Sequence, residues 1–241
     1  NQWDGQCGAP PIPIDNERVV SDEWIAYMRD HMPQAVYLDD VDCGWSMCKA
    51  VGIFEGVKSI TAGLSEIAAY DADIPPITLP PCIQRVGLIG GGGAIIPWLT
   101  ALRQAGTLTS IVIGYMGDAD IAFAWRDALV GNRKTLNWVY ITMCPSMMNF
   151  SGGHAMMDNV CTLAIEFDPR LFDNVDKSDC IRFIIHYALR CRRATLLELS
   201  GIIPDPDAIV PGLGTTYPRY IQSQLPHLKI ECSYAPGPIR R

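Results

Sequence analysis

Four consecutive glycines, Gly90 to Gly93, form the segment of this sequence that is best suited to hold a ligand. They follow an apolar, strand-like run at 85–89 and precede a stretch with helical spacing that starts at Ile95. Glycine permits positive φ angles and lets a ligand approach the backbone, because no Cβ lies in the way. The start of a helix offers free N–H groups and a positive dipole end. We therefore expect this turn to bind a small molecule; a tight turn with nothing bound is the alternative.

Three polar residues near other strand-like runs are candidates for chemistry. Asp168 directly follows the run at 161–167. Ligands of open parallel sheets bind beyond the carboxyl ends of the strands, so Asp168 is placed to orient or deprotonate a nucleophile, unless the Asp-Pro pair simply turns the chain. His154 lies in a glycine-containing loop and could act as an acid or base, or the loop is merely flexible. Glu198 interrupts an apolar run. It either faces the ligand-binding cleft expected at the carboxyl ends of the strands or pairs with an arginine.

Several kinds of site have no signature in the sequence. The four histidines show no metal-binding spacing, and the nine cysteines contain no Cys-x-x-Cys pair, so no metal site is predicted. No phosphate-binding P-loop, nucleophile elbow or paired-carboxylate spacing is present, which argues against kinases and hydrolases. Cysteines inside apolar patterns indicate buried free thiols in a reducing, cytoplasmic compartment. Disulfides involving Cys7, Cys43 and Cys48 remain an alternative.

Composition and net charge limit the classes of partner that we expect this protein to bind. The chain has 241 residues, a formal net charge of −7 and 49% hydrophobic residues, enough for a packed core. General binding to nucleic acid is not expected, since it normally needs a basic patch. A local RNA site is still an alternative, because the sequence contains one compact basic cluster, Arg190, Arg192 and Arg193. The longest uncharged run, 86–102, is rich in glycine, so no membrane span is predicted. Because the chain starts at Asn1, we expect a processed product or an excised segment.

Alternating strand and helix patterns predict an α/β fold: a doubly wound, mostly parallel sheet with flanking helices over residues 82–241. Residues 1–81 are expected to form an N-terminal extension with a helix, a short strand at 35–38 and a proline-rich connector, a possible surface for a protein partner. A fragmentary barrel like the eight-stranded (β/α) barrel is the alternative, and it is less favoured because only six clear strands can be counted. Apolar strand patterns occur at 85–89, 109–113, 137–142, 161–167, 194–199 and 228–233, and helical patterns at 95–102, 121–129, 178–188 and 217–225.

Residues 82–235 resemble class I S-adenosylmethionine-dependent methyltransferases. Gly90 to Gly93 is similar to the glycine-rich turn that ends their first strand, and Asp118, with Asp120 second, is the nearest match to their ribose-binding acidic residue. Glu166-Phe-Asp-Pro169 looks like the loop after their fourth strand, and 187–199 is similar in shape to a later segment. The resemblance implies S-adenosylmethionine bound at Gly90–Gly93 and Asp118. It also implies an acceptor near Asp168, with catalysis chiefly by alignment.

A narrower resemblance, over about 77–146, is to the nucleotide domain of ferredoxin–NADP reductases. It rests on Ile77-Thr-Leu-Pro-Pro81 and on Leu88-Ile-Gly-Gly-Gly-Gly-Ala-Ile-Ile-Pro-Trp-Leu99. This second resemblance implies NADPH in place of S-adenosylmethionine and an oxidoreductase function. A third hypothesis is a non-catalytic subunit that keeps the fold without the motif residues.

Overall fold

An eight-stranded sheet is the framework of the part of the chain that the computed structural model describes: residues 26, 30–31, 37–42, 52, 55–64, 77–90, 95–114, 119–143, 157–167 and 176–234. Its strands are β1 (Tyr37–Asp42), β2 (Ser59–Leu64), β3 (Arg85–Gly90), β4 (Ser110–Gly114), β5 (Trp138–Met143), β6 (Thr162–Phe167), β7 (Leu196–Gly201) and β8 (Lys229–Tyr234). The helices in these residues are α3 (Ile95–Ala105), α4 (Ala119–Asn132), α6 (Lys177–Arg190) and α7 (Tyr217–Gln224). Each of the six strands predicted after residue 82 is present within two residues of its predicted bounds.

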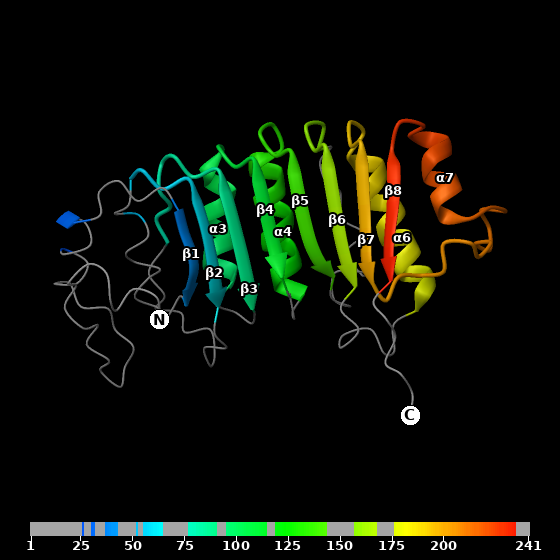
Figure 1. Ribbon diagram of the computed structural model, residues 1–241, viewed down its shortest axis with the longest axis horizontal. Helices are drawn as coiled ribbons and strands as arrows, with labels where there is room; N and C mark the ends of the chain where they lie inside the picture. The colour runs from blue at the N-terminus through cyan, green and yellow to red at the C-terminus, as the bar shows by residue number, and fades with distance from the viewer. Residues whose placement is uncertain are drawn as a thin grey trace, which may run out of the picture.

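All neighbouring strands are parallel, and they lie side by side in the order in which they occur in the chain, from β1 to β8. Right-handed crossovers that always advance in one direction place their helices on one face of the sheet. In Figure 1, α3, α4 and α6 accordingly lie behind the sheet, while α7 lies beyond β8 at one end. The α/β class, the parallel sheet and the flanking helices are confirmed.

The strand order corrects the predicted doubly wound arrangement. A doubly wound sheet reverses its direction of growth once, which puts helices on both faces and leaves a crevice at the point of reversal. This sheet has no reversal from β1 to β8. Its order is that of a barrel, but among the described strands β1 and β8 are the two edges and do not pair with each other, so the sheet is open.

Strands β1 and β2 belong to the same sheet, although they precede residue 82. Strand β2 pairs with β3 along its whole length, from Ser59 beside Arg85 to Leu64 beside Gly90. The predicted strand at 35–38 is found at Tyr37–Asp42, and β2 falls in a stretch whose sequence pattern is ambiguous. The division at residue 81 therefore falls between two paired strands of one sheet.

The starts of α6 and α7 are explained by local capping. Asp176 is the N-cap of α6, and its Oδ1 accepts a hydrogen bond of 2.8 Å from the backbone N–H of Ser178. Thr216 caps α7 through a hydrogen bond from the N–H of Arg219, and Pro218 lies in the first turn, where a missing N–H is harmless.

The core lies between the sheet and its helices, because alternate residues of each strand face them. Val86, Ile111, Val139, Leu163 and Leu197 form one fully buried row across five strands. The helices contribute large buried side chains to the same cluster: Trp98, Trp125, Tyr187 and Tyr217. None of the helices in the described residues is long and apolar enough to cross a membrane.

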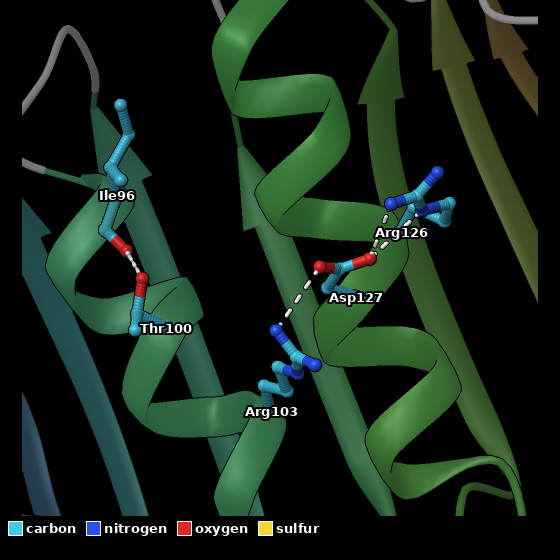
Figure 2. Close-up of polar contacts among 5 residues, drawn as sticks. All are labelled: Ile96, Thr100, Arg103, Arg126 and Asp127. Atoms are coloured by element: carbon cyan, nitrogen blue, oxygen red, sulfur yellow. Dashed lines mark hydrogen bonds and ion pairs between the residues drawn. The ribbon is translucent and has the colours of Figure 1, made fainter.

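Helices α3 and α4 pack side by side and are joined at their surface by an arginine–aspartate contact. Arg103 Nη1 lies 3.4 Å from Asp127 Oδ2, and Asp127 also pairs with Arg126 on its own helix at 2.7 Å (Figure 2). On α3, the Thr100 hydroxyl donates to the carbonyl of Ile96. The Arg103 side chain is 63% exposed, so this ion pair contributes little to stability.

Candidate functional site

The predicted glycine turn lies between β3 and α3, at the carboxyl edge of the sheet. Gly90 is the last residue of β3 and is paired with Leu64 of β2. Helix α3 begins at Ile95, so the predicted order of strand, turn and helix is present. Gly91, Gly92 and Gly93 lie outside the described residues, as do Asp118, which precedes α4 in the chain, and Asp168, which follows β6. The ligand-binding roles of these residues stay predictions.

The strand order separates the two halves of the predicted site. In a doubly wound sheet, reversal makes the first strand and the fourth strand neighbours, so that a cofactor on one meets residues at the end of the other. Here β3 and β6 are separated by β4 and β5. Three strand spacings put the ends of β3 and β6 about 14 Å apart. A ligand that contacts both Gly90 and the end of β6 must therefore cross the ends of two intervening strands.

The face of the sheet that is turned away from α3, α4 and α6 is a second candidate site, and we call it the open face. None of the helices in the described residues lies on it, and it is turned toward the viewer in Figure 1. Its larger side chains are half-buried or exposed, such as Ile89 at 53% and Tyr37 at 64%. Its middle register row runs from β2 to β8 through Thr61, Gly87, Val112, Tyr140, Ala164, Glu198 and Glu231.

A small hydrogen-bonded group occupies the middle of the open face. The Tyr140 hydroxyl donates to Glu166 Oε2 at 2.5 Å, and the Thr142 hydroxyl donates to the same oxygen at 3.0 Å. Burial, followed by the hydrogen bond and charge of Glu166, raises the pKa of Tyr140 to about 12. The Trp138 ring lies 6.3 Å from the Tyr140 ring, between centroids. The group therefore combines two aromatic rings with a carboxylate held by two donors.

Glu198 lies in the middle of β7, on the open face and away from the carboxyl end of the strand where the cleft was expected. Glu198 faces the open side of β7, opposite the buried Leu197 and Leu199, and forms no ion pair with an arginine of the described residues. In register beside it on β8 is Glu231, whose carboxylate pairs with Lys229. Glu198 is thus available to an external group on this face.

Metal and thiol chemistry have little support in the described part of the chain. No group of three or more histidine, cysteine, aspartate or glutamate side chains in it could hold a metal ion. Its five cysteines are free thiols. Cys180 is buried as expected and Cys191 is buried too, whereas Cys161, which was expected to lie buried in the strand at 161–167, is exposed and precedes β6. His154 lies outside the described residues.

Sequence reasoning missed Trp138, Tyr140 and Thr142 as site residues. The signal was their alternation with Val139 and Ile141 within one strand, which marks a strand buried on one face only. A doubly wound sheet has both faces covered by helices, so under that prediction the alternation did not indicate an uncovered face.

The chain matches no protein-family model, and neither the curated proteins nor the solved structures contain a significant match to it.

Proposed function

We propose that this protein is a non-catalytic binding module that uses the open face of its sheet to hold a macromolecular partner. The observation that carries the proposal is the strand order, which puts α3, α4 and α6 on one face only. Parallel sheets usually have both faces covered. Proteins that stack strand-and-helix units in sequence keep one extended face of strands as a binding surface. A partner that covers the open face would complete the second layer of this sheet.

The side chains on the open face support this proposal. Aromatic residues such as Trp138 and Tyr140 are enriched in the buried centres of protein interfaces. Two donors already hold the Glu166 carboxylate, so little side-chain entropy is lost when a partner binds it. Ser110 and Thr162, which lie in register on either side of Trp138, offer hydrogen bonds at the periphery.

Binding of S-adenosylmethionine, with methyl transfer, or of NADPH, with an oxidoreductase function, is our second proposal. It is favoured by one observation, the glycine run that joins the end of β3 to the start of α3. The two intervening strands between β3 and β6 argue against it, because cofactor and acceptor would sit at separated strand ends.

A thermal-shift panel with S-adenosylhomocysteine, NADPH and ATP separates these proposals. A ligand that binds only the folded state at a hundred times its Kd stabilises it by about 2.7 kcal/mol. We expect no shift with any of the three. Stabilisation by S-adenosylhomocysteine or by NADPH would favour the second proposal over the first.

Site-specific photocrosslinking tests the open face directly. A photoreactive amino acid at Val112, in the middle row of the open face, should capture a partner in an extract of the native cells. The same amino acid at Gln104, exposed on α3, is the matched control and should not capture it. The captured protein is then purified and its binding to the wild-type chain measured. Equal capture from both positions would contradict the proposal.

We also propose a cytoplasmic location, on the basis of two buried thiols. Cys180 and Cys191 are free, and burial raises the pKa of Cys180 to about 11 and that of Cys191 to about 12. Free thiols are typical of reducing compartments. The test is to alkylate the thiols in intact cells and then count the modified cysteines. If the four cysteines outside the described residues were found in disulfides, the cytoplasmic location would be contradicted.

A further inference from the structure

We propose that the partner on the open face presents arginine or lysine side chains on an extended polypeptide segment. This inference rests on the proposed function, because it names the chemistry of the same surface. The contact region consists of Trp138, Tyr140, Glu166 and Glu198, and we call it the Glu166 patch.

Charge is the first argument for a basic partner. Over the four consecutive strands β4 to β7, the charged residues on the open face are Glu166 and Glu198, both acidic. Of the cations on neighbouring strands, Lys229 is already paired with Glu231, and Arg85 lies in the first row of β3, near the opposite edge from Glu166. An apolar or acidic partner would cover two carboxylates without neutralising them, which carries a large desolvation cost. A basic partner neutralises both.

The geometry of Glu166 is the second argument. Its Oε2 accepts the hydrogen bonds from Tyr140 and Thr142, which fixes the plane of the carboxylate. Within the described residues, these are the hydrogen bonds that Glu166 receives, so Oε1 is left to accept from outside. Arginine donates from a planar fork to carboxylates and stacks on aromatic rings. Tyr140 places such a ring beside the carboxylate, and the Trp138 ring lies next to that of Tyr140, so a guanidinium at Glu166 can gain from an aromatic ring face.

Spacing supports an extended segment. Glu166 and Glu198 lie on neighbouring strands and two residues apart in register, since Glu166 pairs with Ser200. Strand geometry puts their backbones about 8 Å apart, and alternate side chains of an extended chain project about 6.6 Å apart on one side. Two arginines separated by one residue can therefore reach both carboxylates.

The test uses three fluorescein-labelled peptides of equal length: Arg-Gly-Arg-Ser repeats, the same repeats with glutamate in place of arginine, and Gly-Ser repeats. Fluorescence anisotropy with the full chain measures each Kd at several salt concentrations. We expect saturable binding of the arginine peptide that weakens with salt, and no binding of the other two. The paired substitution Glu166→Gln with Glu198→Gln should raise the Kd at least about tenfold.

A matched control separates the effect of the Glu166 patch on the Kd from the effect of the net charge. Glu55→Gln with Asp158→Asn changes the net charge by the same amount at two exposed positions outside the open face, and should leave the Kd within about twofold. Thermal unfolding of each variant checks that it is folded. Crosslinking of a diazirine-labelled arginine peptide to the wild-type chain, mapped by mass spectrometry to β5 and β6, gives a readout that needs no variant.

Each remaining outcome counts against the inference. It is overturned if the arginine peptide does not bind, or if the control pair weakens binding as much as the patch pair. If instead the glutamate or Gly-Ser peptide binds and is crosslinked to β5 and β6, the inference fails but the open face is still a binding surface. If no peptide binds and S-adenosylhomocysteine or NADPH stabilises the chain, both the inference and the proposed function fail.

Discussion

The phenolic oxygen of Tyr140 lies 2.5 Å from Oε2 of Glu166, so the two side chains join β5 to β6 across the open face. Glu166 is offset by two residues in register from Tyr140, whose direct neighbour is Ala164. The small Ala164 side chain lets the tyrosine lean over β6 toward the carboxylate. The contact thus depends on three residues from two consecutive strands.

Removal of the Tyr140 hydroxyl should weaken the fold modestly. Tyr140→Phe leaves Glu166 with Thr142 as its donor, so we expect a loss of about 1 kcal/mol in the free energy of unfolding by urea. Tyr220→Phe is the matched control, because that hydroxyl forms no hydrogen bond with another of the described residues; its effect should stay within about 0.5 kcal/mol. Equal losses in the two variants would show that the Tyr140–Glu166 contact contributes nothing.

The same contact predicts a loss of stability in alkali. The pKa of Tyr140 is raised from 10.0 to about 12 in the folded state, chiefly by burial and then by Glu166. Its stabilising effect is therefore complete below the unfolded pKa and is lost as the pH rises through the folded pKa. The unfolding free energy of the wild type should fall more steeply between pH 10 and 12 than that of Tyr140→Phe. Parallel curves for the two proteins would contradict the prediction.

Two neighbouring leucines of β7 test whether the sheet is covered on one face only. Leu197 faces the helices and is fully buried, whereas Leu196 is half-buried on the open face. Leu197→Ala should cost about 2–5 kcal/mol of unfolding free energy, because it removes buried methyl groups and leaves a cavity. Leu196→Ala should cost less than about 1 kcal/mol. Similar large losses in both variants, measured in urea, would mean that both faces are packed.

Gly201 should resist substitution at the carboxyl end of β7. Its φ is +85°, and an added Cβ would lie 2.1 Å from the carbonyl oxygen of Phe167, which already accepts a hydrogen bond from Ile202. Gly212 has the same φ with open space around it, so it is the matched control. Gly212→Ala should cost about 1 kcal/mol through backbone strain alone. Gly201→Ala should cost clearly more in thermal or urea unfolding, and equal costs would show that the approach to Phe167 is not tight.

Asn132 should be needed where α4 meets α3 and β4. Its Nδ2 donates to the carbonyls of Leu102 and Ala128, at 2.6 and 2.9 Å, and the side chain is buried. Asn132→Asp replaces this donor with a carboxylate that faces two carbonyl oxygens, so we expect a loss of more than about 2 kcal/mol in unfolding free energy at neutral pH. Lowering the pH should recover part of the loss, because a protonated carboxyl can donate again. A loss that does not change with pH would contradict this reason.

The strands and helices after residue 82 are local properties of the chain, and the sequence alone determined them, whereas β2 could not be predicted from its ambiguous pattern. Apolar runs such as Arg85–Gly90, followed by helical spacing from Ile95 onward, predict a strand and a helix whatever surrounds them. The alternation of Trp138, Tyr140 and Thr142 with buried neighbours is also visible in the sequence. Parallel pairing follows as well, since each strand is joined to the next by a helix or a long connection.

Only the tertiary structure decided on which side each new strand was added. Each crossover can advance to either side of the growing sheet with the same local pattern, because the choice depends on contacts between residues far apart in the chain. Here every crossover advances the same way, which separates β3 from β6 and brings Tyr140, Glu166 and Glu198 together on one face. The position of a residue on a strand could be predicted from its neighbours in the sequence, but the strand that lies beside it could not.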